Sequence, residues 1–245
     1  MTEPVCLMGG WAVYLTVNTK FNELNGRDYI GSRDIDLGFH IDPKWSAKEL
    51  QGSALAQSAK ILKDRGFNGI SSRFVKYYDI NTKAEITEEE SRKKPSYEMF
   101  QLYVDPMGDN THANAHEILG FSLLDEPLLS HVFIDRKIVT LDAFGGTFTL
   151  PTSETLISMK LKSAPNRTKD DKRIKDISDI YALSWYSDVE FQTLKQKVQQ
   201  ILGIKYISEV VSNFTKDEYI AVSTAIGIAP EEISRVTNEL ANDNA

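Results

Sequence analysis

The sequence predicts an α/β fold, in which a mixed, mostly antiparallel sheet is flanked by helices and followed by a helical C-terminal subdomain. Short apolar segments with the two-residue alternation of strands recur through residues 5–150, with helix-type segments between them. From residue 187 onward, one helix-start signal follows another. The 245 residues are enough for one large domain or two small ones. We expect a sheet domain over 1–150 and the helical subdomain over 151–245.

Composition narrows the class of protein. The chain has 35 acidic and 28 basic residues, a net charge of −7, which argues against a surface coated with nucleic acid but leaves room for a local basic patch. Cys6 is the single cysteine and lies in an apolar segment, so a disulfide framework is excluded and a cytoplasmic setting is favoured. The sequence shows neither an apolar run long enough to span a membrane nor a signal peptide. These features predict a soluble, intracellular protein without a membrane partner.

The first element is a short strand that leads into a helix. Residues 5–8 form an apolar strand pattern, Gly9 and Gly10 follow, and a helix pattern begins at Trp11. Glycines at such a turn let the backbone approach a ligand closely. The unpaired N–H groups at a helix N-terminus favour a phosphate there. Gly9 and Gly10 are therefore predicted to belong to a phosphate-binding turn.

The second predicted strand runs from Asp34 to Ile41 and is ended by Pro43. Because side chains alternate along a strand, Asp34 and Asp36 share a face, about 6–7 Å apart. Residues 35 and 37 then face the core. Two neighbouring carboxylates repel each other unless a positive charge lies between them, and Mg²⁺ prefers oxygen ligands of this kind. The pair therefore predicts a magnesium site.

The middle of the chain predicts a helix over 46–65, a strand or hairpin over 67–78 and another strand over 97–105. Residues 81–94 carry four Glu and four Lys or Arg, which indicates a solvated loop or an exposed hairpin tip. Asp105 ends the strand over 97–105 and is a candidate third carboxylate for a two-metal site. The same segment, 105–108, also fits a turn, because Asp is a common first residue of turns.

Residues 109–163 contain weaker signals. His112 and His116 would share a helix face, but the His-Glu-x-x-His pattern of zinc proteases is absent, so a polar loop or helix start is favoured over a zinc site. A short helix is expected over 125–135, strands over 137–142 and 147–150, and a helix from about 153 to 163.

Residues 160–175 form a basic segment with seven Lys or Arg and two Asp. Such a run fits a solvated face as well as a surface for phosphate or RNA. Four short helices are expected after it, over 188–202, 204–213, 216–227 and 230–241, with capping boxes before two of them. We find no catalytic residue pattern in these helices.

Two motifs carry a resemblance to a known family. The run Gly9-Gly10-Trp11-Ala12-Val13, followed by Gly31-Ser32-Arg33-Asp34-Ile35-Asp36-Leu37, resembles the DNA polymerase β-type nucleotidyltransferase superfamily. Within it the pattern is most similar to AbiEii-type toxin nucleotidyltransferases, and also to antibiotic nucleotidyltransferases, over residues 4–185. One feature departs from the superfamily pattern. Many members place a Gly-Ser pair at the helix start, whereas here Gly31-Ser32 directly precedes the Asp pair.

The resemblance assigns roles to residues in both predicted domains. It implies that 1–150 is the catalytic domain, that Asp34, Asp36 and Asp105 hold two Mg²⁺ ions, and that a nucleoside triphosphate (NTP) is the substrate. It adds Lys160 and Asp176 as further catalytic residues, since similar proteins carry a Lys after the sheet and an Asp on the next helix. The remaining expected contacts, to phosphate or RNA, are Gly9, Gly10, Ser32, Lys162, Lys172 and Arg173.

The activity implied is transfer of a nucleoside monophosphate from an NTP to an acceptor hydroxyl. The toxin-like resemblance implies an RNA end, such as a tRNA 3′ terminus, or a protein as acceptor, with an antitoxin as partner. An antibiotic-modifying enzyme and a non-catalytic nucleotide-binding regulatory protein are the two alternatives. The basic segment favours RNA over a cationic small molecule, and three retained Asp residues favour an active enzyme. The sequence does not decide the nucleobase or the oligomeric state.

Overall fold

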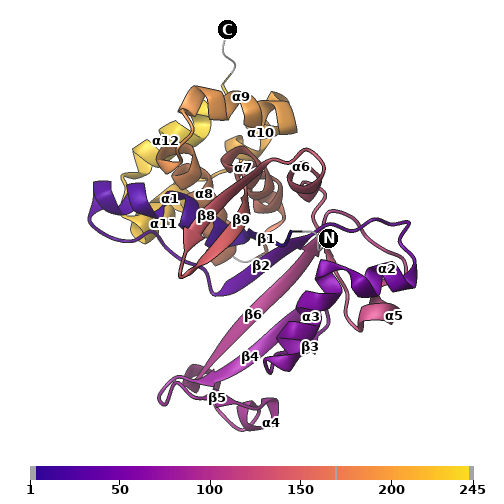
Figure 1. The fold of residues 1–245 in the computed structure, drawn as a ribbon. Coiled ribbons are helices and arrows are strands. Elements are labelled where there is room, and N and C mark those ends of the chain that lie inside the picture. Colours follow the sequence, from indigo (N-terminus) through magenta and orange to yellow (C-terminus); the bar gives the residue numbers. More distant parts are fainter. Residues whose placement is uncertain (1–3, 169, 243–245) are drawn as a thin grey trace.

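A computed structural model describes residues 4–168 and 170–242. In that part of the chain, nine strands form one mixed sheet whose main order is β3-β4-β6-β2-β1-β9-β8, while β5 pairs with β4 and β7 with β6 (Figure 1). The strands are β1 (Cys6–Met8), β2 (Asp34–Phe39), β3 (Asn68–Ile70), β4 (Arg73–Asp79), β5 (Glu85–Ile86), β6 (Met99–Gly108), β7 (Leu124–Asp125), β8 (Ile138–Ala143) and β9 (Gly146–Pro151). The predicted mixed sheet is confirmed.

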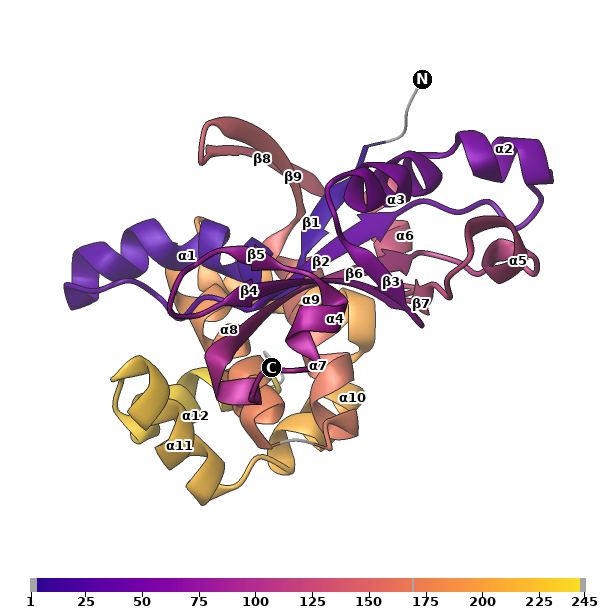
Figure 2. The same ribbon diagram turned by 90° about the horizontal axis from the view of Figure 1, so that it is seen from below.

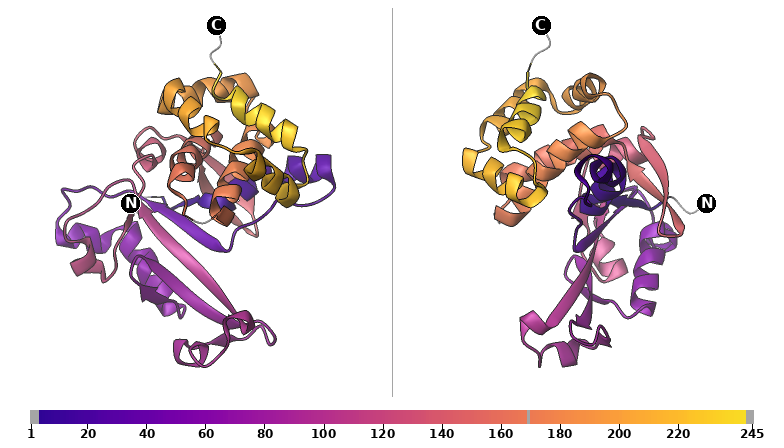
Figure 3. Two further views of the ribbon diagram at one scale, coloured as in Figure 1. Left: turned by 180° about the vertical axis from the view of Figure 1, so that it is seen from behind. Right: turned by 90° about the vertical axis from the view of Figure 1, so that its left-hand side faces the viewer.

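Helices flank this sheet, and in the described part of the chain α7–α12 follow its last strand. They are α1 (Gly9–Asn25), α2 (Ala47–Gly52), α3 (Ala54–Asp64), α4 (Glu88–Ser91), α5 (Ala115–Leu119), α6 (Leu129–Phe133), α7 (Ser153–Ser163), α8 (Asp170–Tyr186), α9 (Phe191–Leu202), α10 (Ile204–Ser212), α11 (Lys216–Ile226) and α12 (Pro230–Glu239). Figure 2 shows α1 beside the C-terminal helices α7–α12, and Figure 3 shows β4 and β6 extending away from these helices. None of the described helices combines the length and apolarity needed to cross a membrane.

The largest core cluster joins α1 to the C-terminal helices. Val17 of α1, Leu156 of α7 and Tyr181 of α8 are all buried in it, together with residues of α9–α12. A second cluster packs α2 and α3 against the sheet through Leu55, Phe74 and other apolar residues. Helix α1 therefore shares its core with helices on the other side of the predicted domain boundary at residue 150. That boundary stays a prediction.

Several predicted elements differ in extent from those observed. The helix expected over 46–65 is two helices, because Ser53 takes an extended conformation, ends α2 and caps α3 by accepting a hydrogen bond from the Ala56 N–H. Helix α1 begins at Gly9 and continues to Asn25, where Gly26 at φ 68° ends it. Helix α8 covers Asp170–Tyr186 and contains Asp176, which the resemblance places on a helix.

The segment 105–108 is a strand, so its interpretation as a turn is wrong. Residues 103–108 of β6 pair in parallel with residues 34–39 of β2. Pro106 is tolerated because the pairing with β4 ends at Val104, so Pro106 has no partner in that neighbour. Residues 81–94 form the exposed tip expected from their charge, since β5 pairs back onto β4 and the short helix α4 follows.

Candidate functional site

The sheet register brings the three predicted carboxylates together. In the parallel pair of β2 and β6, Asp36 lies directly opposite Asp105, and Asp34 lies opposite Tyr103. Since side chains alternate along each strand, Asp34, Asp36 and Asp105 project from the same face of the sheet. The intervening Ile35 packs against the core, as predicted. Residues 69 positions apart in sequence therefore form one acidic group.

The start of α1 lies against this acidic group. Strand β1 places Met8 opposite Asp36, and the helix begins at the next residue, Gly9. A Cβ on Gly9 would lie 1.7 Å from Asp36 Oδ2, and a Cβ on Gly10 would lie 2.6 Å from Ser32 Cβ. Gly9 also has φ 59°, which only glycine adopts readily. The two glycines therefore allow Asp36 and Ser32 to approach the helix N-terminus, where backbone N–H groups lack a side-chain cap.

The nearby positive charges do not fully compensate for the burial of the carboxylates. Burial raises the pKa of Asp36 from 3.8 to about 6, against the opposing effect of Lys160 and with the repulsion of Asp105 and Asp34 added. The pKa of Asp105 is also raised, chiefly by burial, although Arg73 counteracts it. Asp105 Oδ1 is buried and accepts no hydrogen bond from the described residues. Each observation marks a place where a cation would be favourable.

Two basic side chains contact the acidic group directly. An Arg73 guanidinium nitrogen lies 2.6 Å from Asp105 Oδ2, and the guanidinium carbon lies 4.3 Å from the centre of the Tyr103 ring. Lys172 Nζ lies 3.7 Å from Asp34 Oδ2, which places one predicted phosphate contact at the site. Sequence reasoning missed Arg73, because a lone Arg at a strand start gives no signal until the pairing of β4 with β6 is known.

Lys160 and Asp176 belong to a buried ion network behind the acidic group. Lys160 Nζ lies 3.0 Å from Asp176 and 2.7 Å from Asp179, and its side chain is 11% exposed. Asp176 also accepts hydrogen bonds from Ser163 at 2.8 Å and Arg167 at 2.6 Å. Burial opposes the charge of Lys160, yet the two Asp side chains hold its pKa above the usual range. The structure thus pairs these two predicted catalytic residues with each other.

Lys175 extends this network to the start of α1. It forms an ion pair with Asp179, and its ammonium lies 5.0 Å from the centre of the Tyr29 ring. The same nitrogen lies 3.7 Å from the position that a Cβ on Gly10 would take. Sequence reasoning placed Lys175 in the basic segment without naming it as a site residue. Its spacing from Lys172 and Asp179, three and four residues, is the helical signal that would have found it.

Lys162 and Arg173 are not brought to the carboxylates. Side chains two residues apart on a helix point about 200° from each other, so Lys162 faces away from Lys160. The charge of Lys162 instead lowers the pKa of Glu126, which burial raises. Arg173 forms an ion pair with Glu218 and donates to the carbonyl oxygens of residues 164 and 213, both at 3.0 Å. Arg173 therefore connects α8 to the helices that follow it, and neither predicted phosphate contact lies at the acidic group.

The donor set fits magnesium, although its present arrangement is not a closed metal site. Among the described residues, no three His, Cys, Asp or Glu side chains converge on a common metal position. Arg73 and Lys172 already hold two of the three carboxylates. Carboxylate oxygens on one face are nevertheless the ligands that Mg²⁺ takes, and the buried Oδ1 of Asp105 has no hydrogen-bond partner among the described residues. His112 gives no sign of zinc, since its Nε2 lies 2.8 Å from a backbone oxygen, that of Trp45.

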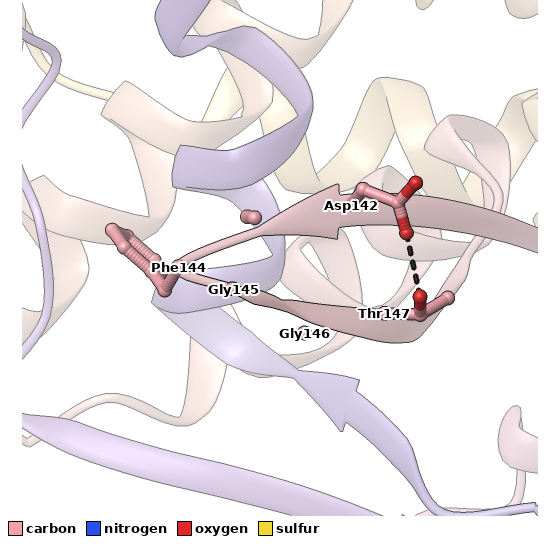
Figure 4. Close-up of a pocket in the computed structure, with 6 residues that line it drawn as sticks. Asp142, Phe144, Gly145, Gly146 and Thr147 are labelled. Atoms are coloured by element: carbon pink, nitrogen blue, oxygen red, sulfur yellow. Dashed lines mark hydrogen bonds between the residues drawn. The ribbon is translucent and has the colours of Figure 1, made fainter.

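A separate hollow lies at the turn between β8 and β9. Figure 4 shows it lined by residues 142–147, with Thr147 donating a hydrogen bond of 2.6 Å to Asp142. Phe144 at its tip is 74% exposed. Strands β9 and β8 end the sheet on the side of β1 away from β2 and β6. The hollow therefore does not include the three carboxylates.

Comparison with known proteins gives little guidance. No family model matches the chain, and no curated protein matches it. One solved structure is similar, an antigenic nucleotidyltransferase-like protein from Paracoccidioides brasiliensis, at 16% sequence identity and a TM-score of 0.41. The alignment covers 91% of this chain and 84% of that one. A likeness this low carries no functional argument, so the function has to be argued from the residues of the site.

Proposed function

We propose that this protein is a Mg²⁺-dependent nucleotidyltransferase that moves a nucleoside monophosphate from an NTP to an acceptor hydroxyl. The observation that carries the proposal is the group of Asp34, Asp36 and Asp105 on one face, in register, at the N-terminus of α1. An acidic group beside free helix N–H groups suits a ligand that is both a metal chelate and a phosphate. An NTP bound to Mg²⁺ is such a ligand.

In this proposal each part of the site binds one part of the substrate. The three carboxylates hold two Mg²⁺ ions, which supply charge neutralisation to the triphosphate when bound. The N–H groups at Gly9 and Gly10, the Ser32 hydroxyl and the Lys175 ammonium bind phosphate oxygens. They are close enough to act together, because both Ser32 and Lys175 lie beside Gly10.

The proposed reaction is an in-line displacement. Asp105 accepts the proton of the acceptor hydroxyl, whose oxygen forms a bond to the α-phosphorus. The bond from that phosphorus to the bridging oxygen breaks, and pyrophosphate leaves. Lys160 and Asp176 act here as positioning residues, since they are buried and paired with each other. Lys160 still lowers the pKa of Asp36 through its charge, which favours the form that binds metal.

The proposed acceptor is anionic, in the first place an RNA end, such as a tRNA 3′ terminus, with a protein hydroxyl as the second option. Lys172 and Arg167 support this choice, because they are partly exposed and lie next to the carboxylates or their supporting network. Once metal ions balance the three carboxylates, the same two charges would oppose a cationic antibiotic. The toxin role and the antitoxin partner rest on the motif resemblance alone.

One observation favours a second candidate, a nucleotide-binding regulatory protein without transferase activity. The carboxylates do not converge on a metal position in the described residues, and Arg73 already holds Asp105. A protein that binds nucleotide only through the start of α1 does not need its carboxylates to converge on a metal ion. The two candidates differ in whether a label from the α-phosphate is transferred.

The test is incubation of the protein with each α-³²P-labelled NTP, Mg²⁺ and total cellular RNA. Asp36→Ala is compared with the wild type and with Asp188→Ala, whose side chain is 93% exposed and paired with Lys20 on the surface. Labelled RNA that depends on Asp36 but not on Asp188 supports the transferase. Labelled protein redirects the search for the acceptor. Equal labelling by the Asp36 variant removes the site, and nucleotide binding without any label favours the regulatory protein.

A further inference from the structure

Arg73 is held between an acid and an aromatic ring at the edge of the site. Its guanidinium donates a hydrogen bond of 2.6 Å to Asp105 Oδ2 and lies 4.3 Å from the centre of the Tyr103 ring. Its side chain is 34% exposed, so the side chain is still in part accessible to solvent. Ion pairing and stacking together fix the orientation of an Arg more firmly than either contact alone.

The pairing with Arg73 leaves Asp105 half satisfied. Asp105 Oδ1 is buried and without a hydrogen-bond partner among the described residues, whereas Oδ2 is occupied by Arg73. An unpaired, buried carboxylate oxygen is costly and is rarely left in that state without a functional reason. The arrangement suggests that Asp105 has a second partner, which replaces or supplements Arg73.

A divalent cation is the partner that fits Asp105. Asp36 lies directly opposite in the sheet register, so a cation on Asp105 meets a second carboxylate at once. A cation on Asp105 Oδ1 and the guanidinium on Oδ2 repel each other, because two positive groups would then lie on one carboxylate. Arg73 would then be released beside the metal, where the phosphates of a bound nucleotide also lie. A guanidinium recognises phosphate by the same two-pronged geometry with which it recognises a carboxylate.

We propose that Arg73 exchanges partners: it holds Asp105 in the metal-free protein and transfers to a phosphate of the NTP when a divalent cation binds Asp105. This inference rests on the proposed function and extends it by naming a residue that links metal binding to nucleotide binding. It accounts for the absence of a closed metal site among the described residues, since Arg73 occupies one of the ligands in advance.

The first test is calorimetric titration of the protein with Mn²⁺ in the absence of nucleotide. Arg73→Gln removes the competitor, so the dissociation constant for Mn²⁺ should fall by about tenfold, the effect of losing one opposing charge-assisted hydrogen bond. The matched control is Arg33→Gln. Arg33 precedes Asp34, is exposed and forms no ion pair with any residue that the structure describes. Its loss removes the same charge without freeing Asp105.

The second test measures binding of α,β-methylene NTP analogues in the presence of Mg²⁺, because these analogues are not cleaved. Arg73→Gln should weaken nucleotide binding by about tenfold, as expected for a lost charge-assisted contact to phosphate, while Arg33→Gln should not. Arg73→Lys keeps the charge but loses the planar fork, so it should also weaken nucleotide binding. Circular dichroism verifies that each variant is folded.

The exchange is supported if Arg73→Gln binds Mn²⁺ more tightly and the nucleotide analogue more weakly than the wild type does. Unchanged or weaker Mn²⁺ binding by this variant overturns it, and so does an equal gain in Arg33→Gln, which would show an effect of net charge alone. If the wild type binds Mn²⁺ and only the exchange fails, the proposed function stands. If neither the wild type nor any variant binds Mn²⁺, the proposed function fails with it.

Discussion

Replacing Asp36 by Asn should stabilise the metal-free protein, and the gain should depend on pH. Asp36 is enclosed by the start of α1 and by two other carboxylates. Its pKa is raised to about 6 from an ordinary 3.8, chiefly by burial. A charge at this position therefore opposes folding, and Asn has nearly the same shape without the charge. We expect a variant that is better folded but unable to bind metal.

The size and sign follow from linkage between protonation and folding. A raised pKa means that the folded protein binds a proton that the unfolded chain has released, so stability falls as pH rises from about 4 to about 6. At about 1.4 kcal/mol per pKa unit, the shift corresponds to about 3 kcal/mol. This value is an upper bound, because Asp36 is half-buried and solvent screens part of the effect. Below pH 4 the gain should vanish.

The assay is urea unfolding in EDTA at several pH values between 4 and 8, with wild type and Asp36→Asn measured side by side. Titrating groups outside the acidic group contribute equally to both proteins, so the difference reports Asp36 and its repulsion with Asp34 and Asp105. Asp79→Asn is a control of opposite sign, because hydrogen bonds from Lys94 and from the Thr82 N–H lower the pKa of Asp79. That variant should lose a nearly constant amount of stability between pH 4 and 8, because the pKa of Asp79 lies below this range in the folded and the unfolded chain, and the loss should shrink only in stronger acid. A gain for Asp36→Asn that is constant with pH, or absent at pH 8, would refute the reasoning.

Two further substitutions test contacts around the site. Gly9→Ala should lower the free energy of unfolding by at least about 1–2 kcal/mol, because its φ is 59°. The clash of the new Cβ with Asp36, at 1.7 Å, should add to this loss. Thermal unfolding should therefore show a larger loss than in Gly145→Ala, where φ is 77° and no atom lies within 4 Å of the new Cβ. Equal losses would contradict the close contact. Lys160→Met should cost up to about 3–5 kcal/mol, because it removes the cation that two buried carboxylates share and leaves them only Arg167 and Lys175 as charged partners. Lys162→Met on the same helix should change stability by less than about 0.5 kcal/mol, and a similar loss in both would contradict the buried network.

Local periodicity was enough to predict part of the candidate site. Asp34 and Asp36 share a face because alternation along a strand is fixed by backbone geometry. Gly9 and Gly10 mark a strand-to-helix turn, and the structure places the start of α1 at Gly9. The place of Asp105 opposite Asp36 is a different matter. It depends on a register between segments far apart in sequence, and the sequence suggested it only through the family resemblance.

The remaining contacts depend on tertiary packing and were missed for that reason. Arg73 reaches Asp105 because β4 pairs with β6, and nothing near Arg73 in the sequence indicates that pairing. A Lys in a basic segment can point to solvent or be buried, and the segment 160–175 fits a solvated face as well as a phosphate-binding surface. The structure buries Lys160 because two Asp of α8 meet it. The break between α2 and α3 at Ser53 was missed, because a Ser inside a helical pattern signals a cap only when the preceding helix is known to end there.

The distribution of charge links metal binding and nucleotide binding in the proposed mechanism. Lys160, Arg167 and Lys175 lie beside Asp176 and Asp179, so the carboxylates of the buried network have enough positive partners without a metal ion. The three carboxylates of the sheet face only Arg73 and Lys172 as direct partners in the described structure, which leaves them net negative. A divalent cation corrects that excess and frees a guanidinium, and the freed guanidinium then requires an anion. Binding of either ligand thereby creates the charge that favours the other, and by thermodynamic reciprocity the coupling must be equal in both directions. The metal should therefore bind more tightly when the nucleotide is present, even though the wild-type site is partly closed by Arg73 in its absence.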